Sequence, residues 1–203
     1  MKPQYKQWIE RDGVIFLDVI TPGLSGREWR RYFREQGIFV SKEMKQTLWP
    51  DNVLKSTQGV ERHIAIIKGR FFSKKDLKTQ QILAEGKRRG WGPISLEDVC
   101  LMRRVLTKAD FIAMGLKTIV GMWALTLEET NQYDFLLSRV FFQAAYGRLL
   151  FPVISESRSG AWLSLFAGGK YNTTPGKWDQ NQGFAFSVSC QIVPRQNKLS
   201  EHQ

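Results

Sequence analysis

The sequence has few of the residues on which most hydrolytic and redox sites depend. Its 203 residues include two cysteines and two histidines. Cys100 lies in an apolar helical pattern and Cys190 in a strand pattern. Both are expected to be buried small side chains in a reducing compartment, and a disulfide framework is excluded. A catalytic triad needs a positioned histidine, but His202 lies in a polar tail. His63 begins an apolar strand, where a structural role is the commoner one.

Other signatures of catalysis and of membrane proteins are also missing. No group of Cys, His and carboxylate residues has the spacing of zinc ligands, and no Walker-type or dinucleotide-binding glycine loop occurs. The pair Glu128 and Glu129 fits the first turn of a helix better than a glycosidase site. We therefore expect no enzyme activity, no cofactor and no metal ion. The lack of a long apolar run and of a signal-peptide pattern favours a cytoplasmic protein without a membrane span.

The net charge of +11 is concentrated in one half of the chain. Residues 27–117 contain 20 Lys and Arg against 10 Asp and Glu, which gives +10, and the ten basic and nine acidic residues elsewhere give +1. Such a field favours nucleic acid, acidic proteins or anionic lipid, although a basic solvated surface has the same composition. The candidate nucleic-acid contacts are Arg30, Arg31, Arg34, Lys74, Lys75, Lys87, Arg88 and Arg89. The last three also suit a helix C-terminus without any ligand.

A repeated local signal marks the starts of helices. Ser or Thr is followed three residues later by an acidic residue, at the head of an apolar pattern with helical period. The pairs are Ser25/Glu28, Ser73/Asp76, Ser95/Asp98, Thr107/Asp110 and Thr126/Glu129. A further short helix is predicted over residues 41–48, and Gly37 and Gly115 are predicted to end two of the helices.

Apolar β-rich runs predict the strands. They cover residues 14–20, 63–67, 118–123, 140–142, 148–154, 161–166 and 184–192. In the last run Phe184, Phe186 and Val188 alternate with small residues, which predicts one buried face and antiparallel pairing. The order indicates an α+β fold with a mostly antiparallel sheet, several helices in the first half and a late loop-rich β region. We expect a single domain over residues 1–194 and a flexible tail over 195–203.

Two segments resemble C-type-lectin-like proteins. Residues 89–98 (RGWGPISLED) resemble the Gly-Trp and Pro-Ser segment that leads into a helix in proteins of the formylglycine-generating-enzyme type. Residues 183–188 (GFAFSV) resemble the last strand of that superfamily, which variable proteins of diversity-generating retroelements share. The middle of the chain also resembles an uncharacterised group of bacterial proteins, at residues 57–60, 68–69, 100–103 and 114–116.

The resemblance implies a compact domain in which the N-terminal and C-terminal strands are close and the late loops bind the ligand. In this chain that surface comprises Trp162, Ser164, Phe166, Lys170, Tyr171, Asn172, Thr173, Lys177, Trp178, Asp179 and Asn181. The calcium-binding motif of lectins and the reactive cysteine pair of the oxidases are missing. The implied function is a non-enzymatic module for a protein or glycan ligand, such as a retroelement target protein.

The sequence therefore leaves two hypotheses for function. One is display of the 162–181 region, whose aromatic rings and lysines can stack on bases, sugars or peptide side chains. In that region Trp162 and Trp178 are alternatively core anchors, with Trp162 favouring the core and Tyr171 the surface. The other is nucleic-acid binding by residues 27–117. Because single-strand binders interleave charge and aromatic residues, the separation of the two along the sequence favours the first hypothesis.

Overall fold

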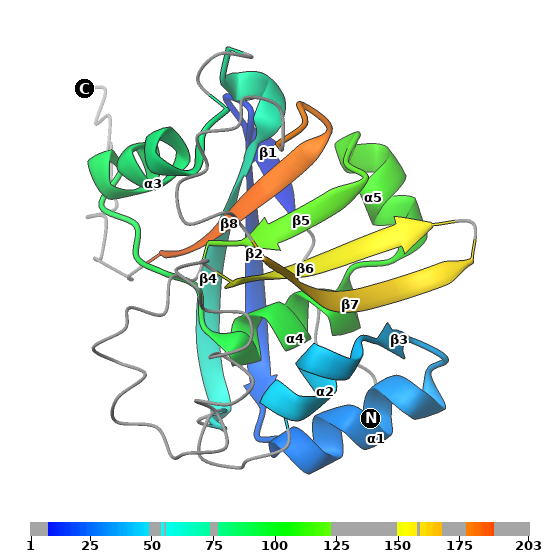
Figure 1. The fold of residues 1–203 in the computed structure, drawn as a ribbon. Coiled ribbons are helices and arrows are strands. Elements are labelled where there is room, and N and C mark those ends of the chain that lie inside the picture. The colour runs from blue at the N-terminus through cyan, green and yellow to red at the C-terminus, as the bar shows by residue number, and fades with distance from the viewer. Residues whose placement is uncertain are drawn as a thin grey trace, which may run out of the picture.

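The structure is a computed structural model that describes residues 8–48, 54, 56–73, 77–122, 150–157, 159–167 and 178–188. These residues form an α+β fold around one eight-stranded sheet (Figure 1). The strands are β1 (Ile9–Arg11), β2 (Val14–Pro22), β3 (Phe39–Val40), β4 (Gln58–Lys68), β5 (Thr118–Gly121), β6 (Leu150–Ser157), β7 (Gly160–Ala167) and β8 (Gln182–Val188). The α-helices are α1 (Gly26–Glu35), α2 (Lys42–Thr47), α3 (Thr79–Arg88), α4 (Leu96–Val105) and α5 (Lys108–Met114), and Gly69–Phe71 is a 3-10 turn.

The sheet is mixed, with the strand order β1-β2-β4-β8-β5-β6-β7-β3. Among the described strand pairs, five are antiparallel, while β5–β8 and β3–β7 are parallel. The α+β class is therefore confirmed. The prediction that the helices concentrate in the first half is wrong, because α4 and α5 extend the helical region to Met114.

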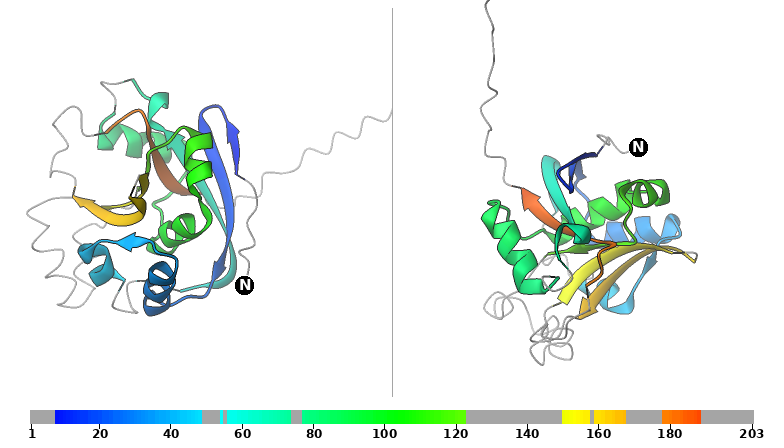
Figure 2. Two further views of the ribbon diagram at one scale, coloured as in Figure 1. Left: turned by 90° about the vertical axis from the view of Figure 1, so that its right-hand side faces the viewer. Right: turned by 90° about the horizontal axis from the view of Figure 1, so that it is seen from above.

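Each face of the sheet has its own hydrophobic core. One core lies under α1, α2, α4 and α5, and the other under α3, on the opposite side of the sheet (Figure 2). Strand β2 supplies both, because successive side chains of a strand point to opposite faces. Ile15 and Leu17 enter the first core and Val14 the second. Cys100 is fully buried in the first core, as predicted, while Cys190 lies outside the described residues.

Local capping explains where most helices begin. Complete capping boxes head α1, α4 and α5 at Ser25, Ser95 and Thr107, which confirms these predictions. The pair Ser73/Asp76 does not cap α3, which begins at Thr79 after Lys78 and has no side-chain cap, and residues 74–76 lie outside the described residues. The pair Thr126/Glu129 and the strand predicted over 140–142 lie outside the described residues. None of the helices in the described part of the chain is both long enough and apolar enough to cross a membrane.

The closing strand β8 differs from its prediction. Gly183, Phe184, Ala185 and Phe186 are all buried, so both faces are covered and the predicted single buried face is wrong. The reason is position, since β8 lies between antiparallel β4 and parallel β5 in the middle of the sheet. The implied closeness of the terminal strands is only approximate, because β4 separates β2 from β8.

Candidate functional site

The first side of the candidate site is the solvent face of α1. Arg27, Arg30, Arg31 and Arg34 follow the spacing i, i+3, i+4, i+7, which places them along one face of a helix. The opposite face is anchored by buried aromatic rings of the same helix. Because that face fills the core, the four guanidinium groups are left on the outer side of the helix.

A helix-ending turn carries the chain from α1 to the edge of the sheet. Gly37 has φ of +65°, which glycine adopts without strain. The amide of Ile38 donates to the carbonyl of Phe33 at 2.8 Å, and that of Gly37 donates to the carbonyl of Arg34 at 3.2 Å. These two bonds form a Schellman motif. The turn directs the next residue, Phe39, into β3.

Strand β3 brings together parts of the chain that are far apart in sequence. It pairs in parallel with β7, with Phe39 opposite Trp162 and Val40 opposite Leu163. The amide of Ser41 extends the contact by donating to the carbonyl of Leu163 at 3.0 Å. The basic helix α1 and the late aromatic strand thereby become two sides of one site.

Helix α2 forms the third side and is held close to α1. A Cβ atom added at Gly26 would lie 2.1 Å from the carbonyl oxygen of Leu48, so only glycine permits this approach. Ser41 caps α2 by accepting from the amide of Met44 at 3.2 Å. The exposed Lys45 of α2 faces the same groove as the arginines of α1.

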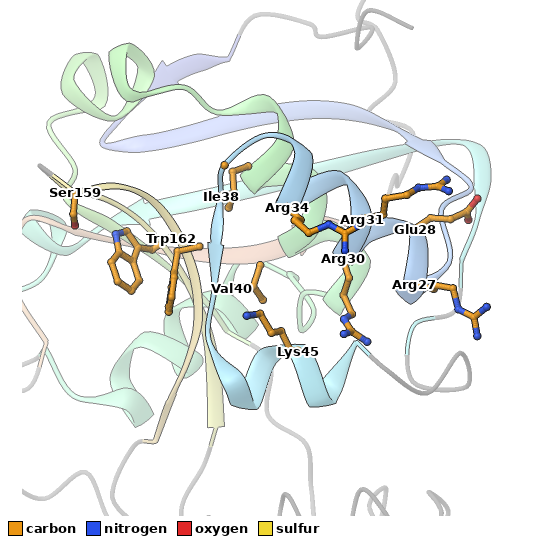
Figure 3. Close-up of a pocket in the computed structure, with 12 residues that line it drawn as sticks. Arg27, Glu28, Arg30, Arg31, Arg34, Ile38, Val40, Lys45, Ser159 and Trp162 are labelled. Carbon is orange, nitrogen blue, oxygen red and sulfur yellow. The ribbon is translucent and has the colours of Figure 1, made fainter.

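These elements enclose an open groove of about 910 Å³ (Figure 3). The figure shows Trp162 and Ser159 at one end, Lys45 near the middle and the arginines along α1. The lining comprises Arg27, Glu28, Arg30, Arg31, Arg34, Gly37, Ile38, Phe39, Val40, Lys45, Ser159 and Trp162. Five of these side chains are cationic and one is acidic, so the groove is an electropositive surface.

The one acidic residue of the lining is already engaged. A carboxylate oxygen of Glu28 accepts from the amide of Ser25 at 2.8 Å and from its hydroxyl at 2.9 Å. These bonds, the backbone bond foremost, lower the pKa of Glu28, and the charge of Arg31 acts in the same direction. Glu28 therefore serves the helix cap, and it is the one acidic side chain among the described lining residues.

The far end of the groove carries an aromatic pair. The ring centroids of Phe39 and Trp162 are 4.0 Å apart with an interplanar angle of 48°, and Phe39 is 48% exposed. The indole Nε1 of Trp162 donates to the hydroxyl of Ser157 at 3.1 Å, and that hydroxyl lies 2.8 Å from the hydroxyl of Ser159. Lys45 Nζ is 5.8 Å from the centroid of the Phe39 ring. A fixed aromatic surface thus adjoins a cation.

The ligand-binding residues predicted in the 162–181 region lie partly within and partly outside the described residues. Trp162 lines the groove, and Ser164 lies two residues further along β7, on the same face of the strand. Phe166 also belongs to β7. Asp179 and Asn181 occupy an exposed turn in which a carboxylate oxygen of Asp179 accepts from the amide of Asn181 at 2.7 Å. The remaining predicted loop residues lie outside the described residues, namely Lys170, Tyr171, Asn172, Thr173 and Lys177.

Trp162 and Trp178, both predicted as ligand contacts with a core position left open, lie in different environments. Trp178, predicted as a ligand contact, is 5% exposed and packs edge-on against Phe151 and Phe184 in the second core. Its Nε1 donates to the hydroxyl of Thr79 at 3.1 Å. Trp162, for which the core was favoured, is half-buried at the groove. Trp178 is therefore a core anchor.

Two of the predicted nucleic-acid contacts at the end of α3, Arg88 and Arg89, bind an acidic side chain of the same helix. Arg88 donates to Glu85 from Nε and Nη2, both at 2.7 Å, and Arg89 donates to Glu85 at 2.6 Å. The bonds from Arg88 make the largest contribution to lowering the pKa of Glu85 to about 2. Arg89 also lies 5.1 Å from the ring of Trp91. Lys87 is exposed, and Lys74 and Lys75 lie outside the described residues.

Part of the positive charge counted in the sequence is buried. Lys68 is 2% exposed and forms an ion pair with Glu10 at 2.6 Å. Arg103 is similarly buried and pairs with Glu156 at 2.5 Å. Charges neutralised in this way add little to the external field.

A cluster that the sequence reasoning missed lies on β2 and β4. Asp18, Glu61 and His63 place one ligand atom each within 4.8 Å of one another. Glu61 and His63 are two residues apart on β4, a spacing that the sequence shows. Asp18 joins them only because β2 pairs with β4, which places Asp18 opposite His63. Three such donors are the protein share of an open zinc site. The 2.7 Å contact between His63 Nδ1 and a carboxylate oxygen of Asp18 also fits the structural role predicted for His63.

The groove suits a ligand that carries both anionic groups and flat rings. Arginine forms forked hydrogen bonds with phosphate and carboxylate groups, and aromatic side chains stack on planar rings. The described lining has no histidine, cysteine or pair of free carboxylates, which are the usual groups of acid–base or nucleophilic catalysis. No family model, curated protein or solved structure matches this chain.

Proposed function

We propose that the protein binds nucleic acid in the groove between α1, β3, α2 and β7. The observation that carries the proposal is the concentration of five cationic side chains around one acidic residue that is already bonded. Phosphate groups account for most of the hydrogen bonds and affinity in protein–nucleic acid complexes, and Arg and Lys are their principal partners.

The spacing of the arginines supports this ligand. Arg27 and Arg34 are seven positions apart, which corresponds to about 10 Å along a helix axis. A row of this length can contact more than one phosphate group of a nucleic-acid strand. Neither Arg27 nor Arg34 forms an ion pair with the described part of the chain. Their guanidinium groups are therefore available to a ligand.

The fold brings the basic and the aromatic residues together. In the sequence, the basic and the aromatic residues lie in different halves, which disfavours a single-strand binder. The pairing of β3 with β7 places Phe39 and Trp162 in the same groove as the arginines. Charge and aromatic rings thus share one groove, although they are far apart in the sequence.

Fluorescence anisotropy with labelled oligonucleotides at several salt concentrations tests the proposal. For the variant with Arg27, Arg31 and Arg34 all changed to glutamine, we expect at least tenfold weaker binding at low salt. The slope of log affinity against log salt should fall by about 2–3, because each lost phosphate contact removes about 0.7–0.9.

A charge-matched variant is the control. Lys78, Lys87 and Lys117 are exposed outside the groove, and changing them to glutamine removes the same charge. This control should bind nearly as the unchanged protein does. Equal weakening by both variants, or no binding of any oligonucleotide at low salt, would contradict the proposal.

The C-type-lectin-like assignment and display of the 162–181 region to a protein or glycan stay predictions. Trp162 belongs to both accounts, since it is a member of the predicted loop surface and lines the groove. Trp178 is buried, so an alanine variant at that position reports on folding rather than on ligand binding.

A further inference from the structure

We propose that Phe39 and Trp162 form a stacking platform for an unpaired base, so that the groove takes single-stranded nucleic acid. This inference rests on the proposed function and adds the class of ligand. The base would stack on the rings at the aromatic end of the groove. The row of arginines would bind phosphate groups, which single and double strands both carry.

The outward position of the two rings follows from the register of the sheet. Val40 and Leu163 are buried, at 5% and 0% exposure, and they pair with each other across β3 and β7. Their neighbours Phe39 and Trp162 also pair, and successive side chains of a strand alternate between the faces. The core is therefore filled by the aliphatic pair, and the aromatic pair is directed to the other face.

The platform is held in place before any ligand binds. The ring contact of 4.0 Å and the bond from Trp162 Nε1 to Ser157 restrict both side chains. Phe39 is nevertheless 48% exposed, so part of its surface is available for contact. A preorganised aromatic surface binds a flat ring at a lower entropy cost than a mobile one.

Cations beside the platform point to a base that is attached to phosphate. Lys45 Nζ lies 5.8 Å from the Phe39 ring centroid, and the arginines of α1 continue along the groove. Aromatic stacking together with a basic track is the arrangement by which proteins hold single strands without reading their sequence. Neutral sugars would use the rings but not the row of guanidinium groups.

A duplex cannot use the platform in the same way. Its bases are stacked on one another and present only their edges in the grooves. Single strands therefore gain both the phosphate contacts and the stacking contact, while duplexes gain only the phosphate contacts. The inference predicts a preference for single strands that depends on the two rings.

The test compares three labelled probes of equal length, which are an oligothymidylate, a duplex and an abasic oligonucleotide. For Phe39→Ala and Trp162→Ala we expect binding of the oligothymidylate to weaken about 5- to 150-fold, the range for loss of one stacked base. Binding of the duplex and the abasic strand should change less than twofold. The salt slope should stay unchanged, because no phosphate contact is lost.

Phe39→Tyr keeps a ring and is the matched control, with affinity expected within a fewfold of the unchanged protein. Thermal unfolding of each variant verifies the fold. Two results would overturn the inference: Phe39→Ala and Trp162→Ala leaving oligothymidylate binding unchanged, or weakening all three probes equally. Either result leaves the proposed function intact as long as the arginine variant loses affinity and salt dependence. Failure of the arginine variant to do so would instead overturn the proposed function itself.

Discussion

Changing Trp29 to alanine is expected to lower the free energy of unfolding by about 3–5 kcal/mol, the range for truncating a large buried aromatic side chain. Trp29 is fully buried, and its ring stacks on that of Phe33 at 5.4 Å and meets Tyr32 edge-on at 6.0 Å. These contacts fix α1, and with it the arginine row, to the first core. Denaturant unfolding measures the change, and for a chain of this size each kcal/mol corresponds to about 2–4 °C in Tm.

Trp29→Phe is the control for this prediction. The indole Nε1 of Trp29 is buried and makes no hydrogen bond within the described part of the chain. Phenylalanine keeps an aromatic ring and removes this unpaired donor, so its cost should be well below that of alanine. If Trp29→Ala lowered the free energy of unfolding by less than about 1 kcal/mol, the ring of Trp29 would not anchor α1 to the first core.

The second large effect is expected from Arg103→Met. Arg103 on α4 is 3% exposed in its side chain, and its Nη2 donates to Glu156 of β6 at 2.5 Å and to the carbonyl of Leu106 at 2.7 Å. Its Nη1 donates to the carbonyl of Ser155 at 3.2 Å. Removing one member of a buried ion pair leaves the other charge without a partner, and the cost is about 3–5 kcal/mol. Chemical denaturation measures it.

A double variant separates the charge from the packing. In Arg103→Met with Glu156→Met no carboxylate is left unpaired, so the double variant should be more stable than Arg103→Met alone. Arg34→Met removes an exposed arginine and should change stability by less than about 0.5 kcal/mol. If the double variant were less stable than Arg103→Met alone, the unpaired carboxylate of Glu156 would not be the cause of the destabilisation.

The helix boundaries were the most predictable part of the fold, because they depend on neighbouring residues. Ser25, Ser95 and Thr107 each cap a helix through bonds that span three positions, as their sequences indicate. The start of α3 was missed for the converse reason. Lys78 precedes that helix without a side-chain cap, so no local signal marks the start.

The site could not be predicted in the same way, because it depends on pairing between distant segments. Phe39 lies beside Trp162 only through the parallel contact of β3 with β7, and no local pattern specifies that contact. Charge counting was limited by burial as well. Lys68 and Arg103 contribute to the basic total of the first half, yet both are buried in ion pairs.

Ultraviolet cross-linking of a single-stranded oligothymidylate to the whole protein tests the central claim most directly. Mass spectrometry of the digested product identifies the cross-linked peptides. The groove predicts cross-links at Phe39 and Trp162, which are lost when Arg27, Arg31 and Arg34 are changed to glutamine. Cross-links confined to other peptides, such as those of α3 with Lys87, Arg88 and Arg89, would contradict the assignment of nucleic-acid binding to this groove.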